Sequence, residues 1–303
     1  MKPLVIHPAK AQERSLAIDA VAQVEKILHD FWASAPGNSL QLPSGEKAWG
    51  EPRIAVARGD DPLFLRNKEL IGDFLWTPAQ AYAIAFPHLP RPAAGQLRVI
   101  SYLLPQTPET LADQRRETTM PAERWARSRF HGEEFNCEMR LHLAAVLTRA
   151  GHPSVAPERL ADFGYRRSPR FGLASNWSER HAAFVAGHGT FGLSDALITR
   201  WGQAVRLGSV VSCIDLPVTE RAYGEDPHAW CLWHAKGTCG ACAKRCPVGA
   251  ITIQGGHDKQ ACFKYIRDVT APYATETYGT GATPCGLCQV NIPCEGRVPT
   301  GLL

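Results

Sequence analysis

Cys239-Gly-Ala-Cys242-Ala-Lys-Arg-Cys246-Pro247 is the stretch that decides the fold of the C-terminal part of this chain. Two cysteines separated by two residues, with a third cysteine and a proline after three more, are typical of runs that hold iron–sulfur clusters. In two-cluster proteins the last cysteine of such a run ligates the other cluster. Eight of the ten cysteines fall in the last quarter of the sequence, enough thiolates for two [4Fe–4S] clusters. They are Cys231, Cys239, Cys242, Cys246, Cys262, Cys285, Cys288 and Cys294.

The cysteine pattern departs from a complete run in two places. A complete run has a further cysteine three residues before Cys239, where this chain has Lys236. We expect Cys231 to replace that ligand, with His234 as a weaker alternative. The spacing from Cys288 to Cys294 is also longer than usual, so the loop between them must bulge.

Zinc and disulfide bonds are the competing explanations for these cysteines. Zinc ribbons also use pairs of cysteines two residues apart, but a third cysteine before a proline is rare in them. Disulfides are disfavoured because the cysteines are clustered and the N-terminus does not resemble a secretory signal. We therefore expect iron–sulfur clusters in a reducing compartment, the cytoplasm.

Composition sets further limits. The net charge of +4 is mild and no basic run stands out, so no nucleic-acid surface is indicated. No window approaches ~18 uninterrupted apolar residues, so we expect no membrane span. With 303 residues, 45% of them hydrophobic, the chain can form one large domain and one small one.

The first part of the chain alternates between helical and extended patterns. Interleaved helices and strands over about 215 residues indicate an α/β or α+β domain, residues 1–215, followed by a cluster domain, residues 216–303. Thr77 and Pro78 are expected to begin a short helix, as N-cap and first helical residue. We expect the other helices at 9–33, 121–150 and 177–186, and strands at 53–57, 97–104, 154–157, 197–198 and, with alternating burial, 205–213.

A glycine-rich segment, Gly187-His-Gly189-Thr-Phe-Gly192, fits the pattern G-x-G-x-x-G. A dinucleotide fingerprint must follow a strand and open a helix, whereas the residues before this segment are expected to be helical. Nicotinamide binding is therefore disfavoured. The glycines instead allow a tight turn or bring the backbone close to a large flat group, with the hydroxyls of Thr190 and Ser194 beside it.

The glycine segment and the cysteines together carry a family resemblance. Residues 179–192, which start with Glu179-Arg180, and the following 197–199 resemble the cobalamin-binding core of epoxyqueuosine reductases and reductive dehalogenases. In that superfamily a two-cluster ferredoxin module comes next, as here. The segment 126–136 is similar to a superfamily segment that ends in Tyr-His, here Phe135-Asn136. The resemblance covers roughly residues 50 to 295.

The resemblance implies an α+β, nitroreductase-like cobalamin-binding domain with a C-terminal ferredoxin-like domain holding two [4Fe–4S] clusters. It also implies base-off cobalamin, a small-molecule substrate and a ferredoxin or flavodoxin as electron donor. Cys137 and Cys213 match no ligand position and are expected to be buried free thiols. By position, one cluster would be held by Cys231, Cys239, Cys242 and Cys294, and the other by Cys246, Cys262, Cys285 and Cys288.

The cofactor contacts implied by the resemblance come with departures from the epoxyqueuosine reductase pattern. Leu173 stands where those enzymes have an aspartate, Leu193 where they have a lysine, and no tRNA-binding helical module follows. These departures disfavour epoxyqueuosine reduction itself. The implied cofactor contacts are Asn136, Gly187, His188, Gly189, Thr190, Gly192 and Ser194, and the candidate proton donors are His188, Glu134, Tyr165 and His181.

The predicted function is an oxidoreductase that passes electrons through two clusters to a corrin cobalt and reduces a small organic substrate by dehalogenation or deoxygenation. One alternative is an electron-transfer protein that reactivates a partner corrinoid protein. Another is a flavin-dependent reductase on the same fold. Glu133 and Glu134 could bind a corrin amide or act as an acid, but a solvated helix face is expected for them. Arg127 and Arg129 could bind a substrate carboxylate or phosphate, although exposed helix arginines usually do neither.

Overall fold

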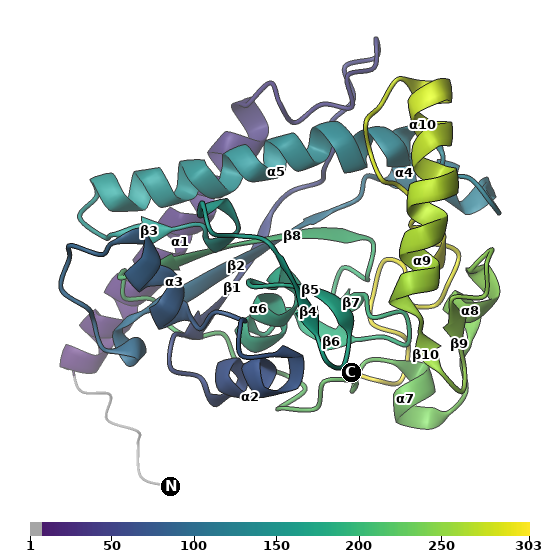
Figure 1. Cartoon of the computed structure of the whole chain (residues 1–303). Helices are drawn as coiled ribbons and strands as arrows, with labels where there is room; N and C mark the ends of the chain where they lie inside the picture. The colour runs from purple at the N-terminus through teal and green to yellow at the C-terminus, as the bar shows by residue number, and fades with distance from the viewer. Residues whose placement is uncertain (1–7) are drawn as a thin grey trace, which may run out of the picture.

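The computed structural model describes residues 8–303, and side chains from residue 19 onward. Its centre is a four-stranded sheet in the order β1-β2-β8-β3 (Figure 1). Every neighbouring pair is antiparallel, so the fold is a mixed helix-and-sheet fold of the α+β kind and not α/β. The strands are β1 (Arg53–Arg58), β2 (Arg98–Pro105), β8 (Val205–Ser212) and β3 (Ser154–Val155).

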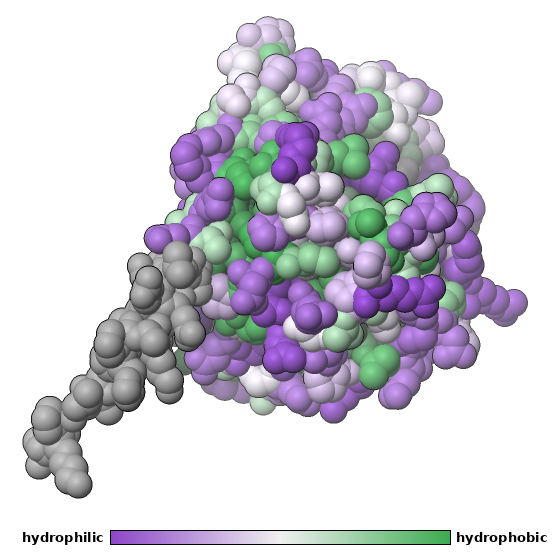
Figure 2. All heavy atoms as spheres, turned by 90° about the vertical axis from the view of Figure 1, so that its left-hand side faces the viewer, coloured by the Kyte–Doolittle hydropathy of each residue, from purple (hydrophilic) through white to green (hydrophobic). Residues whose placement is uncertain are grey.

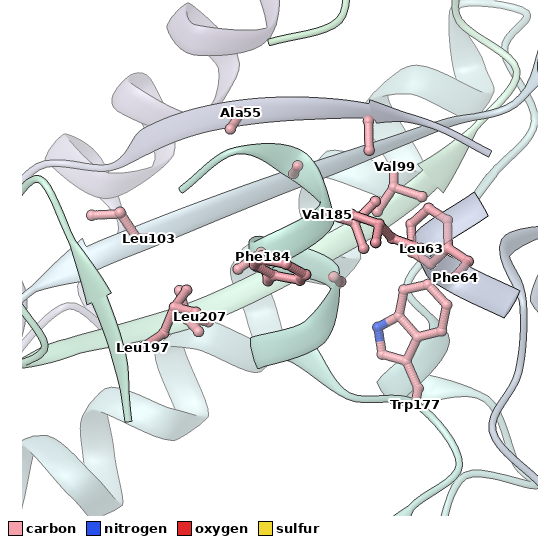
Figure 3. Close-up of a cluster of buried hydrophobic side chains, with 14 of the residues drawn as sticks. Ala55, Leu63, Phe64, Val99, Leu103, Trp177, Phe184, Val185, Leu197 and Leu207 are labelled. Atoms are coloured by element: carbon pink, nitrogen blue, oxygen red, sulfur yellow. The ribbon is translucent and has the colours of Figure 1, made fainter. Parts of the chain in front are cut away.

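Helices cover both faces of the sheet. Ile100, Tyr102 and Leu104 of β2 face the long helices α1 (Pro8–Ser34) and α5 (Glu123–Arg149). Val99 and Leu103 of β2 face the opposite layer, where Phe184 and Val185 of α6 pack beneath the strands (Figure 3). That layer contains α2 (Pro62–Ile71), α3 (Pro78–Ala85) and α6 (Glu179–Ala186).

The expectation that buried and exposed residues alternate along β8 is wrong, because helices cover both faces of the sheet. Six consecutive residues of β8 are buried, from Leu207 to Ser212. A strand covered by helices on both faces has no solvent side, so its residues do not alternate between core and water.

Most of the other expected elements are confirmed, including their end signals. Thr77 caps α3 in a capping box with Gln80, and Pro78 is its first residue. Ser178 caps α6, which ends at Gly187 in the left-handed conformation. Among the elements that were not expected are two helices, α2 and α4 (Pro108–Arg116), each of which begins at a proline after a capping side chain. The hairpin of β4 (Tyr165–Ser168) and β5 (Gly172–Ser175) was not expected either.

The cysteine-rich part lies to one side of the sheet, at the right of Figure 1. Its side chains share a hydrophobic core with the first part, since Trp230, Ile251 and Val298 pack in one cluster with Leu197 and Ile198. The division at residue 215 stays a prediction. The elements on this side are α7 (Leu232–Lys236), α8 (Ala241–Arg245), β9 (Ile251–Thr252), β10 (Gly256–His257), α9 (Lys259–Tyr265), a π-helical turn (Ile266–Thr270) and α10 (Ala271–Tyr278).

The surface is mainly polar. Figure 2 shows hydrophilic residues over most of one face, with hydrophobic residues between them. Within residues 8–303, none of the helices combines the length and the apolar character needed to cross a bilayer.

Candidate functional site

The first group of cysteines surrounds one cavity. Cys231 is the N-cap of α7, Cys242 lies in α8, and Cys294 follows the loop after the last 3₁₀ turn (Leu287–Gln289). The predicted bulge occurs at Asn291, whose φ is +56° and whose N–H donates to Glu295 at 2.6 Å. The cavity lining includes Cys231, Cys239, Cys242 and Cys294, together with Gly192, Leu193, Ser194 and Gln203.

The thiols of the second group lie within electrostatic reach of one another. Burial raises the pKa of Cys288 well above its usual range, and the thiols of Cys285 and Cys262 raise it further. Burial likewise raises the pKa of Cys285 to about 11, with Cys262 and Cys246 acting in the same direction. Cys242, from the first group, also acts on Cys288, so the two groups are neighbours.

The thiols are a poor environment for their own ionisation but a suitable one for a metal cluster. Burial raises the pKa of Cys242 to about 11, and Cys231 and Cys239 add to the shift. Iron binds thiolates, so a positively charged metal core would supply the positive charge that stabilises these buried sulfurs in their ionised form. The cysteines therefore fit [4Fe–4S] clusters in donor type and number. Over residues 8–303, no three His, Cys, Asp or Glu side chains are arranged around the position of a single metal ion.

His257 connects the second group to the rest of the protein. Its Nδ1 lies 3.3 Å from a carboxylate oxygen of Asp195, and its ring lies within electrostatic reach of the thiol of Cys262. Lys259 reaches the same carboxylate at 3.5 Å. Charge and hydrogen bonds near a ligating sulfur are among the means by which proteins adjust cluster potentials.

The glycine segment packs against the cysteine-rich part instead of forming an open loop. Its residues Gly189–Phe191 form strand β6, which pairs with β7 (Leu197–Thr199). Thr190 is fully buried, and its hydroxyl accepts a hydrogen bond from the backbone of Trp230 at 3.0 Å. The motif thus follows a helix and opens a strand, opposite to a dinucleotide fingerprint.

Internal packing explains each glycine of the motif. Gly187 has φ of +102°, where glycine is favoured. A Cβ on Gly189 would stand 2.0 Å from the carbonyl oxygen of Ile198, and one on Gly192 would stand 3.3 Å from the Ile198 side chain. The fold therefore requires glycine at 189 and favours it at 187, and a side chain at 192 would be tightly packed, so a close approach to a cofactor is not needed to explain these glycines.

Two residues that the resemblance assigned to the cofactor have buried partners. The Nε2 of His188 lies 3.1 Å from the carbonyl oxygen of Ser101, and burial lowers the pKa of His188 to about 4. The amide of Asn136 donates to the carbonyl of Leu207 at 3.1 Å and accepts from the Tyr102 hydroxyl at 2.8 Å. Both side chains are directed into the core between sheet and helices, since sequence spacing does not show which way a side chain points.

The other candidate proton donors are dispersed. Glu134 is on the exposed side of α5, 3.4 Å from His131. Burial lowers the pKa of His181 to about 3, and its Nδ1 lies 2.7 Å from the hydroxyl of Ser178. Tyr165 is 65% exposed on β4 and lies within electrostatic reach of Arg129.

The two leucines that stand where epoxyqueuosine reductases have an aspartate and a lysine differ in their surroundings. Leu193 is buried and lines the cavity of the first cysteine group, whereas Leu173 is exposed on β5.

Sequence reasoning missed a set of six charged residues, which we call the arginine–glutamate cluster. Arg140, whose side chain is 1% exposed, contacts carboxylate oxygens of Glu133, Glu158 and Glu179 at 3.3, 2.6 and 3.4 Å. Glu133 is not on a solvated face as expected. The cluster consists of Arg129, Arg140, Arg206, Glu133, Glu158 and Glu179.

The pKa values of two carboxylates of this cluster are shifted in opposite directions. Burial disfavours the charge of Glu133, but Arg206 and Arg140 prevail and lower its pKa to about 2. Burial raises the pKa of Glu179 to about 7, only partly opposed by Arg140. A sequence signal existed, since residues 129, 133 and 140 share one stripe of α5 at helical spacing.

Comparison with known proteins gives similarity only at the level of structure, since no family model and no curated protein matches the sequence. The catabolic reductive dehalogenase NpRdhA, solved in complex with 3-bromo-4-hydroxybenzoic acid, is similar with a TM-score of 0.50 and 15% identity. The similarity covers 82% of this chain and 30% of that one. An epoxyqueuosine reductase from Streptococcus thermophilus has a TM-score of 0.46 and 13% identity, over 90% and 65% of the two chains.

The predicted resemblance is confirmed at the level of the fold by the solved reductive dehalogenase. At these identities the comparison with the dehalogenase establishes a shared fold. This chain spans less than a third of that enzyme's length.

Proposed function

We propose that the protein is an iron–sulfur and corrinoid-dependent reductase that transfers electrons through two [4Fe–4S] clusters to a small organic substrate. The observation that carries the proposal is the arrangement of the eight cysteines in two neighbouring groups of four, beside a fold similar to that of a reductive dehalogenase. Dehalogenation or deoxygenation is the proposed reaction type.

The two cysteine groups support a relay of electrons. Cys288 of the second group and Cys242 of the first act on each other electrostatically, so clusters held by the two groups would be neighbours. Burial of Trp230 and of the Cys231 side chain keeps water from the first group. Burial and hydrogen bonds to sulfur together set the potential of such clusters.

A corrinoid, when bound, would supply a cobalt ion that passes electrons to the organic substrate. The residues that suit its polar periphery are not those of the glycine segment. Arg180 lies within electrostatic reach of Arg206 on one side and of Cys288 and Cys262 on the other. Its exposed guanidinium donors therefore stand between the arginine–glutamate cluster and the second cysteine group, where we place the ligand.

One observation favours a second candidate, an electron-transfer protein that reduces a partner corrinoid protein. His188, Thr190 and Asn136, three of the residues implied as cofactor contacts, are buried and hydrogen-bond groups of the core. Under this alternative both clusters are present but the chain retains no corrinoid. Flavin in place of corrinoid remains the third possibility.

Anaerobic purification followed by iron and sulfide analysis tests the proposal first. Hydroxocobalamin is then added, the protein is desalted, and its absorbance is recorded. About eight irons per chain with retained corrinoid of base-off spectrum support the reductase, whereas eight irons without corrinoid or flavin support the electron carrier. Bound zinc in place of iron would contradict both.

A further inference from the structure

Three arginines of the arginine–glutamate cluster converge on a single carboxylate. The Glu133 carboxylate forms ion pairs with Arg140 at 3.3 Å, with Arg129 at 3.7 Å and with Arg206. Arg140 is balanced by its two other carboxylates, Glu158 and Glu179. Among the side chains that the structure describes, from residue 19 onward, neither Arg129 nor Arg206 has an ion pair other than that with Glu133.

Arg129 and Arg206 therefore form a pair of like charges that share the ion-pair partner Glu133, with Glu158 within electrostatic reach of both. Arg206 is the largest cause of the lowered pKa of Arg129, about 10, which shows that the two guanidinium groups repel each other. Close like charges persist in a folded protein when another part of the structure holds them or when an anion joins them. Their side chains are 37% and 27% exposed, so an anion from solution can reach both.

The position of the pair suits a ligand that reacts beside the clusters. Arg129 lies on α5, and Arg206 is the second residue of strand β8. These two elements pack together in the sheet domain. Arg180 lies within electrostatic reach of Arg206 and of the thiols of Cys288 and Cys262. Tyr165, on the exposed hairpin, lies within reach of Arg129. A bound anion would thus face the second cysteine group.

We propose that Arg129 and Arg206 bind the carboxylate of a small organic substrate and orient the rest of that molecule toward the second cysteine group. This inference rests on the proposed function for the identity of the site and adds the chemical class of its substrate. Two guanidinium forks match the two oxygens of a carboxylate, which a single ammonium group does not. Arg140 is excluded from this role because its side chain is 1% exposed and already holds three carboxylates.

Calorimetric binding tests this proposal without turnover. The cluster-loaded protein is titrated anaerobically with 3-bromo-4-hydroxybenzoate and with the matching neutral amide, 3-bromo-4-hydroxybenzamide. We expect the carboxylate to bind and the amide to bind much more weakly. Because binding is read directly, a protein that retains no corrinoid can still bind the carboxylate, so failure of the proposed function and failure of this inference are distinguishable.

Two variants locate the site. We expect Arg129→Gln and Arg206→Gln each to weaken carboxylate binding about 10- to 100-fold, the range for a lost charge-assisted hydrogen bond, and to leave amide binding unchanged. Arg129→Lys, which keeps the charge but not the fork, should give a smaller loss. Arg149→Gln is the matched control, because it lies on the exposed far end of the same helix, roughly 30 Å away. Unfolding curves check that each variant is folded.

Two results would overturn the inference. One is carboxylate binding that is the same in the wild type, Arg129→Gln and Arg206→Gln. The other is a cofactor role for the arginines: the glutamine variants would then lose retention of cobalamin, which carries a phosphate in its nucleotide loop, but not of cobinamide, which lacks it. In that case the anion is the cofactor's phosphate and not the substrate.

Discussion

The cysteine-rich part and the arginine–glutamate cluster both bury groups that can carry negative charge, but they compensate that charge differently. In the cysteine-rich part, Cys288 is surrounded by other thiols, and each raises its pKa further. In the sheet domain, Glu133 is surrounded by guanidinium groups that lower its pKa to about 2. The first region therefore needs a positive charge from outside the polypeptide, whereas the second supplies its own, with three arginines for three glutamates.

Removal of one ligating cysteine should have the largest effect on this comparison. We expect Cys288→Ala to reduce the iron content from about eight to about four per chain, because one [4Fe–4S] cluster loses a ligand. Iron and sulfide analysis with EPR of the reduced protein measures this. Cys213→Ala is the control, since Cys213 belongs to neither group and should keep all the iron. Full iron in Cys288→Ala would remove that cysteine from the cluster site.

Loss of the central arginine tests the opposite region. Arg140→Gln leaves three carboxylates without their shared partner in a buried place, so we expect it to cost about 3–5 kcal/mol of stability. Urea unfolding of the cluster-loaded protein gives the value. Lys26→Gln, which breaks an exposed ion pair on α1, should change stability by less than about 1 kcal/mol. Equal effects of the two variants would mean that the arginine–glutamate cluster is solvated.

Glu179 should make stability depend on pH. Its pKa rises from 4.5 to about 7 on folding, so the folded state binds more protons between these values. Stability from this group is complete below pH 4.5 and is lost as the pH rises to about 7, by at most about 3 kcal/mol. Glu179→Gln should remove this dependence, so the variant gains stability relative to wild type between pH 5 and pH 8.

Unfolding curves at several pH values measure that difference, and Glu134→Gln serves as the control because Glu134 is exposed. A wild-type minus Glu179→Gln difference that stays constant from pH 5 to pH 8 would show that Glu179 is ionised at its ordinary pKa.

The smallest expected effect is on the potential of the second cluster. The His257 ring lies within electrostatic reach of Cys262, and a cationic imidazole there stabilises the more negative, reduced cluster. We expect His257→Gln to lower the midpoint potential of one cluster and leave the other unchanged, as followed by an EPR-monitored redox titration. Lys264→Gln, on the exposed side of α9, is the control. A shift in the midpoint potential of both clusters, or of neither, would show that His257 does not act specifically on the second cysteine group.

Local patterns predicted much of the fold because they report local physics. Thr77 marks a helix start because its side chain accepts a hydrogen bond from a free N–H group of the first turn, and Pro78 does so because it has no N–H group to satisfy. The structure confirms this start. The apolar run of β2 predicted a central strand because only a strand covered on both faces is apolar throughout. The alternation expected for β8 failed because the sequence did not show that helices cover it on both sides.

The candidate site divides in the same way. The sequence by itself located the eight cysteines and the short loop that spaces three of them, whereas their division into two ligand sets was implied by the family resemblance and stays a prediction. Only the tertiary structure decided that His188 is directed into the core and that the glycines serve packing. It also brought Glu158, Glu179 and Arg206 from three elements onto one stripe of α5. Buried charge is compensated by whichever partners are close in space, and chain order does not encode that distance.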